Sequence, residues 1–551
     1  MGDEADNIDK LYKNYEILSD AKEKISEHEK EYREILDAVQ GTAKEKRLAS
    51  QFIGKFFKHF PALNDLAIDR QLDLCEDEDP QIRRQAIKDL PALCKETKEN
   101  TPKIADILAQ LLITEDTGEL QQVNLSLQTL SKIDPLGTLT GIFSQIISGD
   151  EATRLRNFQY ILNKFMKQGS EILTKEVEDF VVAEIKKILM DVTAEEFHLC
   201  MAILNQTRLS KTITGHSELV NIAIEQADLD ADLGTLAAED ETVERFIQCA
   251  SEAIPYFSKQ VESTLFIKFM CEKLLPLQVW NLIAAGDDQI QTQLRLLKVF
   301  SEMSSYCGAL EKPSEKVESI YNVLLEFMPL PPLDADLNET PSFNFSHAEC
   351  LLFSLHALCR QCPEFLTFPN DPAKLKDFRS RLQYLARGTQ GYIKKLQEAI
   401  KGKSNDEMKS EESQIKVTAL KTTSNISTLI RDLFHSPPSF KSIIQLSWVT
   451  PKAKKLDSKS SSSSSTISSS GTKRHAPITF NSENGKSDDT KGSKHSRNSS
   501  SGQRVYTPPS GKYSGKVSYS RSGGSGGGGG GGGRSRNNNR NRGRNVYRKN
   551  Y

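Results

Sequence analysis

The stretch from Asp77 to Leu90 limits the possible folds of this chain more than any other part of the sequence. Pro80 suits the first turn of a helix, and Ile82, Ala86 and Leu90 then fall on one apolar stripe. The small side chain of Ala86 lets a neighbouring helix approach closely. This pattern is typical of the second helix of a HEAT repeat, a unit that buries its apolar face by stacking on further repeats.

Other stretches repeat this pattern in part. Lys46 to Phe60 places a basic pair before a run of aromatic residues, and Asp150 to Phe165 has an acidic start followed by apolar residues at helical spacing. Thr193 and Glu196 form a capping box that predicts a further helix start, and Asp287 predicts another. A chain of 551 residues far exceeds one ordinary domain, and an array of repeats can bury a core at this length. The sequence therefore predicts an all-α, HEAT- and armadillo-like helical-repeat solenoid.

The organisation changes twice along the chain. Residues 1–213 are expected to form HEAT-like repeats, and residues 214–448 less regular, armadillo-like repeats. Residues 449–551 begin with a Ser-rich tract and contain eight consecutive glycines, Gly526 to Gly533. Such a composition cannot bury enough apolar surface to fold alone, so we expect a disordered basic tail.

One expected helix, 375–399, has a regular apolar seam with alternating spacings of three and four residues. Its members are Leu375, Phe378, Leu382, Leu385, Thr389, Tyr392 and Leu396. Heptad spacing of this kind could zip onto a partner helix. The alternative is that the seam packs against a neighbouring repeat, and the interior glycines Gly388 and Gly391 favour that alternative, since each costs about 1 kcal/mol relative to Ala in a helix.

The tail and the body carry opposite charges. Residues 449–551 contain 21 Lys and Arg against four Asp and Glu, whereas the whole chain has a net charge of −2. The arginines near the C-terminus are interleaved with Gly, Asn and Tyr, a pattern that suits RNA because guanidinium groups contact phosphate and stack on bases. The residues expected to bind RNA are Arg534, Arg536, Arg540, Arg542, Arg544 and Arg548. A solubilising tail without a specific ligand is the alternative.

Two further groups of basic residues have possible roles. A split nuclear-import signal is predicted at Lys452, Lys454 and Lys455 together with Lys473 and Arg474. The residues from Lys44 to Arg47 and from Lys55 to His59 could form a basic patch, or could be the solvated face of helices.

Several classes of function are disfavoured. No HExxH, GxSxG or paired-carboxylate pattern is present, and Gly402-Lys403-Ser404 lacks the upstream glycine of a phosphate loop, so we expect no enzyme, cofactor or small-molecule substrate. The cysteines are expected to be reduced core residues, and the CxxC of Cys359 and Cys362 has no second pair at zinc spacing. No stretch is long and apolar enough to predict a membrane span.

Six stretches together resemble one known family. They are KEKRLASQFIGKFFKHFP (44–61), QLDLCEDEDPQIRRQAIKDLP (71–91), EMSSYCG (302–308), FMPLPP (327–332), LFHSPPSFKS (433–442) and YTPPSGKYS (506–514). In this order they are similar to the apoptosis inhibitor 5 family, also called antiapoptosis clone 11. The resemblance implies a nuclear antiapoptotic adaptor with HEAT-like and then armadillo-like helices.

The resemblance also implies a role for the seam. The corresponding helix of the family is implicated in binding the nuclear protein Acinus and restraining the DNA fragmentation that follows its cleavage. In this chain Thr389 stands where the family pattern has a leucine, which favours the packing alternative for the seam. The leading hypothesis is a monomeric nuclear scaffold that binds Acinus-like proteins and holds RNA through its tail. The alternative is an RNA-processing scaffold that affects survival indirectly.

Overall fold

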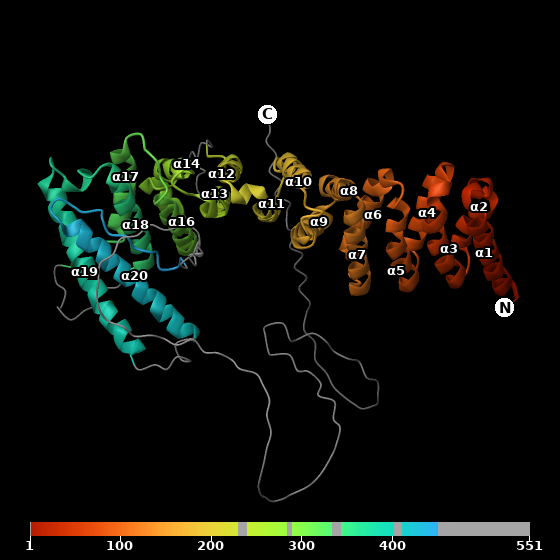
Figure 1. Ribbon diagram of the computed structural model, residues 1–551. Helices are drawn as coiled ribbons and strands as arrows, with labels where there is room; N and C mark the ends of the chain where they lie inside the picture. The colour runs from red at the N-terminus through yellow and green to blue at the C-terminus, as the bar shows by residue number, and fades with distance from the viewer. Residues whose placement is uncertain (1, 230–239, 284–288, 333–342, 402–409, 450–551) are drawn as a thin grey trace, which may run out of the picture. The chain divides into compact units, whose positions relative to one another are not determined.

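The protein is built from stacked helices, as the sequence predicts. The computed structural model describes residues 2–229, 240–283, 289–332, 343–401 and 410–449. Within these ranges every regular element is a helix, which confirms the all-α solenoid (Figure 1). Among the described helices, none is long and apolar enough to cross a membrane.

The helices of the N-terminal half are mostly 10 to 19 residues long. They are α1 (Gly2–Asp20), α2 (Glu29–Asp37), α3 (Ala43–Phe56), α4 (Asn64–Cys75), α5 (Pro80–Asp89), α6 (Thr101–Gln110), α7 (Thr117–Ile133), α8 (Pro135–Ser148), α9 (Glu151–Asn163), α10 (Lys175–Ile188) and α11 (Ala194–Gln206).

The helices of the C-terminal half vary more in length. They are α12 (Ile213–Ala227), α13 (Asp240–Ala253), α14 (Thr264–Phe269), α15 (Leu277–Ile283), α16 (Gln289–Ser304), α17 (Pro313–Glu326), α18 (Phe345–Leu358), α19 (Pro372–Ile400) and α20 (Glu411–Phe434). Short 3₁₀ helices follow several of them, including η9 (Arg208–Lys211), and a π-helical turn, η11 (Met270–Leu274), follows α14.

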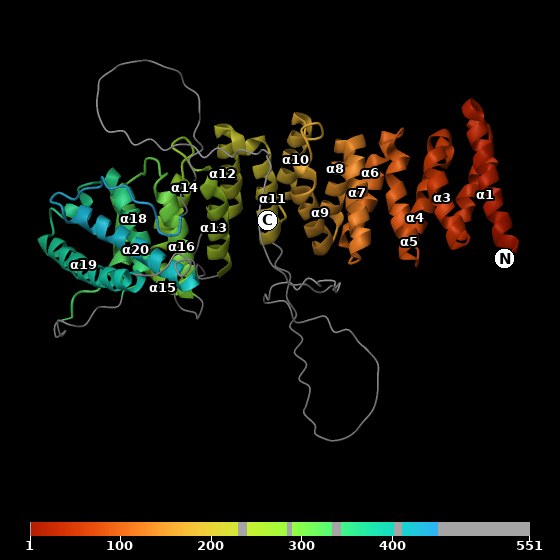
Figure 2. The ribbon, with the colours of Figure 1, turned by 60° about the horizontal axis from the view of Figure 1, so that its bottom comes forward.

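The packing order is that of a solenoid. Helices two apart in the chain contact each other, as α1 does with α3, α3 with α5, α6 with α8, α9 with α11, α16 with α18, and α18 with α20. Sequential helices such as α4 and α5, or α12 and α13, also pack together. Each repeat therefore rests on its neighbours (Figure 2). The buried side chains form one continuous apolar core through the described helices.

The local signals read from the sequence mark real helix starts. The Asp79 side chain accepts a hydrogen bond from the backbone N–H of Gln81 and caps α5, in which Ile82 and Ala86 are buried. Thr193 and Glu196 form the expected capping box of α11. Asp150 caps α9, so the weaker repeat copy is also a helix of the stack. The expected start at Asp287 lies outside the described residues.

A close helix contact depends on Gly141 in α8, at the crossing with α6. A Cβ atom at this position would lie 2.4 Å from the carbonyl oxygen of Pro102 and 2.5 Å from the backbone nitrogen of Asp106. Both neighbours are backbone atoms of α6 and cannot move aside without shifting the helix. The absence of a side chain is therefore what lets α6 and α8 approach.

Replacing Gly141 with Ala is expected to destabilise the protein by about 1–3 kcal/mol, because the added methyl group must separate two packed helices. The control is Gly169→Ala, since a Cβ atom there would have nothing within 4 Å. Urea unfolding followed by circular dichroism measures both variants. Equal midpoints for the two would contradict the close contact.

Candidate protein-binding surfaces

The seam predicted at 375–399 lies in α19, and most of it is buried. Phe378, Leu382 and Leu385 have almost no exposed surface, and Leu396 is 6% exposed. α19 packs along α20, the helix that follows it. Phe378 also contacts Tyr321 of α17, with ring centroids 5.4 Å apart, so helices of the same chain cover the seam. This is the packing alternative, in which neighbouring helices of the same chain take the place of a partner helix.

The remaining seam positions differ from a zipper in detail. Thr389 is buried, and its hydroxyl donates a 2.7 Å hydrogen bond to the carbonyl of Leu385 within the same helix. Leu375 is half-buried, and Tyr392 is 39% exposed and stacks on Phe345 with ring centroids 5.1 Å apart. A partner could therefore reach Tyr392 and the edge of Leu375 but not the centre of the seam.

The residues predicted in the tail lie outside the described part of the chain. This applies to the RNA-binding candidates Arg534, Arg536, Arg540, Arg542, Arg544 and Arg548, and to the import-signal candidates Lys452, Lys454, Lys455, Lys473 and Arg474. Their roles remain predictions from the sequence.

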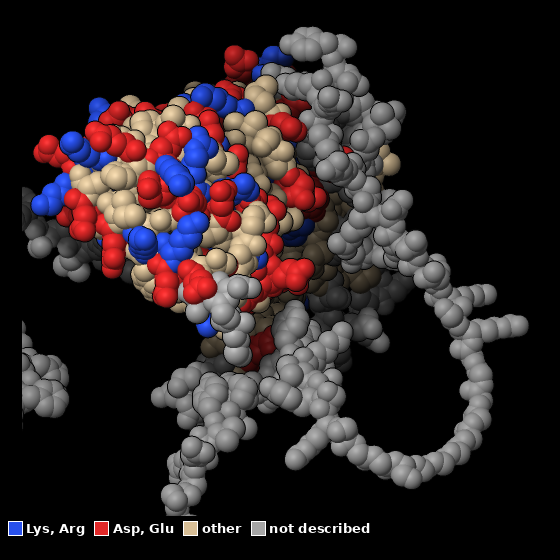
Figure 3. Space-filling model, turned by 90° about the vertical axis from the view of Figure 1, so that its right-hand side faces the viewer, with Lys and Arg blue, Asp and Glu red and all other residues tan. Residues whose placement is uncertain are grey.

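The basic residues near the N-terminus are interspersed with acidic ones. Lys46 lies 2.6 Å from a carboxylate oxygen of Asp77, Arg47 lies 3.5 Å from Asp79, and Lys58 lies 3.4 Å from Glu96. Figure 3 shows blue and red side chains mixed over the N-terminal end of the molecule. This face is a solvated surface of both signs, and a uniformly basic patch is not seen on it.

A groove of about 1930 Å³ opens between α10 and α16, in the middle of the stack, and sequence reasoning did not find it. Its walls come from α10 to α14, η11 and α16, which run from gold to green in Figure 1. Buried residues such as Phe197 and Phe269 form its floor, whereas Met190 and Leu265 point apolar side chains outward with 78% and 53% of their surface exposed. These two side chains are available for apolar contacts with a bound protein.

Charged side chains of both signs line the groove, and several of them are paired with one another. The pairs are Lys186 with Glu218, Arg245 with Glu241, Arg295 with Glu244 and His198 with Glu252. Exposed ion pairs of this kind contribute only about 0–1 kcal/mol each. A bound protein could therefore exchange them for its own pairs at little cost in free energy.

The groove has no evident chemistry of its own. Cys249 lines it, but burial raises the pKa of this thiol to about 12, so it is not a thiolate at neutral pH. Met190, Leu265 and paired side chains offer contacts and not a nucleophile with its base. The arrangement suits binding of a macromolecule.

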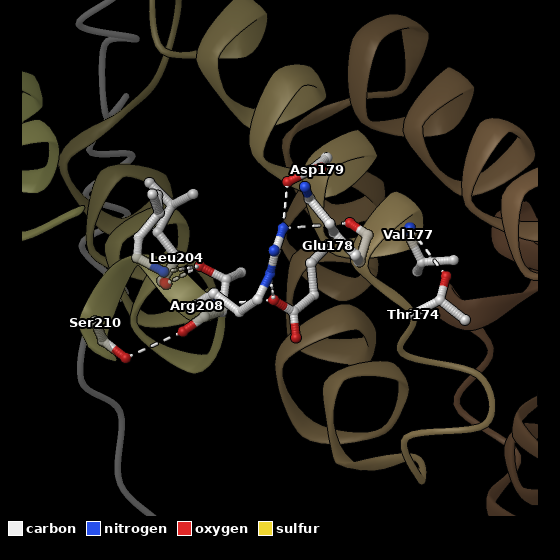
Figure 4. Close-up of polar contacts among 10 residues, drawn as sticks. Thr174, Val177, Glu178, Asp179, Leu204, Arg208 and Ser210 are labelled. Atoms are coloured by element: carbon white, nitrogen blue, oxygen red, sulfur yellow. Dashed lines mark hydrogen bonds and ion pairs between the residues drawn. The ribbon is translucent and has the colours of Figure 1, made fainter. Parts of the chain in front are cut away.

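The N-terminal end of α10 is held by Arg208 of η9, and none of the residues in this contact lines the groove. Its guanidinium donates a 2.9 Å hydrogen bond to Glu178 and a 2.5 Å hydrogen bond to Asp179, both near the N-terminus of α10 (Figure 4). The backbone N–H of Arg208 also donates to Glu178 at 3.0 Å, and the Thr174 hydroxyl caps the same helix by accepting from Val177. These contacts tie the start of α10 to η9, the segment after α11.

Comparison with known proteins agrees with the six sequence motifs. The family model described as Apoptosis inhibitory protein 5 matches residues 8–546. The Drosophila melanogaster protein named Apoptosis inhibitor 5 homolog is 59% identical to this chain over 521 residues, which are 94% of each chain. Human Apoptosis inhibitor 5 is 45% identical over 94% of this chain and 95% of the human protein. A rice Apoptosis inhibitor 5-like protein is 31% identical over 65% of this chain. The chain therefore belongs to the Apoptosis inhibitory protein 5 family.

Proposed function

We propose that this protein is a nuclear antiapoptotic scaffold that binds partner proteins such as Acinus and thereby restrains apoptotic DNA fragmentation. Membership of a family named for inhibition of apoptosis supports the antiapoptotic role. This family is one of helical-repeat proteins and is not an enzyme family. The observation that carries the scaffold role is the groove between α10 and α16.

The groove suits a segment of protein with apolar anchors. Met190 and Leu265 provide exposed apolar contacts, and paired charges of both signs lie around them. A partner segment with one or two large apolar residues, flanked by Lys or Arg and Asp or Glu, would bury the two side chains and re-pair the charges. Burial of apolar surface would supply the affinity, and the charges would supply orientation and specificity.

The Arg-rich tail is proposed to hold RNA in addition to this protein contact. Six arginines between residues 534 and 548, among Gly and Asn, match the chemistry of binding without sequence preference. Such binding would weaken steeply as salt rises, because it releases counterions from the phosphates. The same charge asymmetry supports the second candidate, an RNA-processing scaffold whose effect on survival is indirect.

The test compares binding and DNA fragmentation for four forms of the protein. These are the full chain, residues 1–449 fused to a heterologous import signal, the double variant Met190→Asp with Leu265→Asp, and the control Ile147→Asp, which alters a 61% exposed apolar residue of α8 outside the groove. Each is used to capture Acinus and RNA from nuclear extract, with and without RNase, and each is assayed for protection of nuclei against apoptotic fragmentation.

The double groove variant is expected to lose at least about tenfold in partner affinity, the change produced by about 1.4 kcal/mol of lost contact energy. The Ile147→Asp variant and the form with residues 1–449 are expected to bind the partner as the full chain does, with or without RNase. Both are also expected to protect nuclei against DNA fragmentation as the full chain does. A full loss of protection on removing the tail would favour the RNA-processing scaffold. Unchanged binding by the groove variant would show that the partner uses another surface.

A further inference from the structure

The last described segment of the chain folds back over the helices before it. Residues 436–448, here called the strap, follow α20 without regular structure (Figures 1 and 2, thin blue ribbon). The carbonyl of Leu446 accepts a 3.0 Å hydrogen bond from Lys421, and the carbonyl of Gln445 accepts one of 2.8 Å from Asn425. The strap therefore runs back along α20, and the predicted tail begins directly after it in the sequence.

The strap is held by hydrogen bonds and by a few apolar side chains, since Phe440, Ile444 and Trp448 pack against the core. Arg360 donates to the carbonyl of Phe440 at 3.2 Å, and the indole N–H of Trp448 donates to Glu302 at 2.6 Å. Leu446 is buried, but Ile443 is 94% exposed. The strap has no regular structure and lies over α18 and α20, so it is a segment that can open locally while the helices stay packed.

A buried carboxylate holds the end of the strap. Glu349 of α18 is fully buried and accepts hydrogen bonds from the backbone N–H of Ser447 at 3.0 Å and from its hydroxyl at 2.7 Å. Asn425 donates to the same carboxylate at 2.6 Å. The described donors to Glu349 are thus neutral groups, and the Ser447 hydroxyl is one of them.

A second serine of the strap, Ser442, lies five residues before Ser447 and contacts a carboxylate in the same way. Asp432 accepts from the backbone N–H of Ser442 at 2.9 Å and from its hydroxyl at 2.8 Å, and its carboxylate lies 3.0 Å from Nε2 of His356. Burial opposes ionisation of Asp432, but hydrogen bonds from Ser442 and His356 outweigh burial and leave its pKa lowered. Each serine gives both of its donors to one carboxylate, so the strap has two equivalent clamps.

A phosphoryl group on the hydroxyl of Ser442 or Ser447 would replace an attractive hydrogen bond with repulsion between two negatively charged groups. The oxygen would lose the proton that it donates, and phosphate brings only acceptors with a charge of about −1.5 to −2 at neutral pH. At Ser447 that charge would face the buried carboxylate of Glu349, whose described hydrogen-bond partners include no cation. Repulsion and desolvation would both oppose binding of the modified strap.

We propose that Ser447 is a phosphorylation site that controls the strap. A protein kinase transfers the γ-phosphoryl group of ATP to Ser447 Oγ: the new O–P bond forms as the β,γ-phosphoanhydride bond breaks, the hydroxyl proton passes to the kinase's base, and ADP leaves. Ser447 is half-buried, so the kinase acts on a transiently detached strap, and the phosphate then keeps it detached. Hydrolysis by a phosphatase restores the clamp. Detachment uncovers the face of α18 and α20 and lengthens the tether of the tail.

The experiment places phosphoserine at position 447 of the full chain by amber suppression and measures hydrogen exchange of the strap amides. The control carries phosphoserine at Ser436, which is exposed at the start of the strap. Exchange at the amides of Ser442 and Ser447 is expected to accelerate at least about tenfold with phosphoserine 447 and to change little with phosphoserine 436. Iodide quenching of Trp448 gives a second readout, since Trp280 is buried.

A matched variant separates charge repulsion from simple bulk. Glu349→Gln keeps an acceptor for Asn425 and adds an amide that can donate to phosphate, so in this background phosphoserine 447 is expected to accelerate exchange much less. Unchanged exchange with phosphoserine 447, equal acceleration by phosphoserine 436, or the same acceleration with Glu349→Gln would each overturn the proposal. So would mass spectrometry that finds no phosphate on Ser447 in protein isolated from dividing and from apoptotic cells with phosphatases inhibited.

Discussion

Replacement of Leu382 by Asp will unfold the pair of α19 and α20 while the N-terminal repeats stay helical. Leu382 is fully buried in α19, which packs against α20. The substitution removes a packed side chain and buries a carboxylate, at a cost on the order of 5 kcal/mol. In a solenoid each repeat depends on its neighbours, so the loss concentrates at the C-terminal end. Hydrogen exchange resolved by peptide, with circular dichroism of the whole chain, measures it.

The control for this variant is the adjacent exposed position. Gln383→Asp introduces the same charge on the same helix, but at an exposed residue, and should change stability by less than about 0.5 kcal/mol. If Leu382→Asp stayed as stable as Gln383→Asp, the seam would not be core, and a zipper with a partner helix would regain its basis. The expected unfolding also means that lost partner binding in such a variant reports the fold and not a contact.

The seam shows what the sequence could predict and what it could not. Its spacing correctly predicted an amphipathic helix, found at Pro372–Ile400, because that spacing depends only on neighbours in the chain. The identity of the covering element could not be read from the spacing, since a partner helix and a helix of the same chain offer similar apolar surfaces. The answer required the position of α20, which contacts α19 along its length.

Local signals were the most informative for the same reason. The cap at Asp79 and the capping box at Thr193 involve residues two or three apart, and both are present. The groove and the strap could not be found in this way. Glu244 and Arg295 are 51 residues apart, and Glu349 and Ser447 are 98 apart, so no pattern within a helix-length window connects them. The motif containing residues 433–442 pointed to the family, but its spacing did not indicate a strap.

Removal of the Arg154 side chain is also expected to lower the stability of the protein strongly, because it breaks a buried ion pair between repeats. Arg154 of α9 forms two hydrogen bonds with Glu196 of α11, at 2.6 and 3.1 Å, and donates to the carbonyls of Ile146 and Asp191. The Glu196 side chain is only 2% exposed. Arg154→Ala therefore leaves a buried carboxylate without its cation, which costs about 3–5 kcal/mol. Urea unfolding measures the change.

Two comparisons identify burial as the cause of this loss. Arg47→Ala removes an arginine from a pair 3.5 Å long whose side chains are 41% and 39% exposed, and should cost about 1 kcal/mol or less. Adding Glu196→Gln to Arg154→Ala removes the buried charge while keeping an acceptor for the N–H of Thr193, so the double variant should be more stable than Arg154→Ala alone. A double variant less stable than the single one would mean that packing by the arginine stem, and not the unpaired charge, holds α9 to α11.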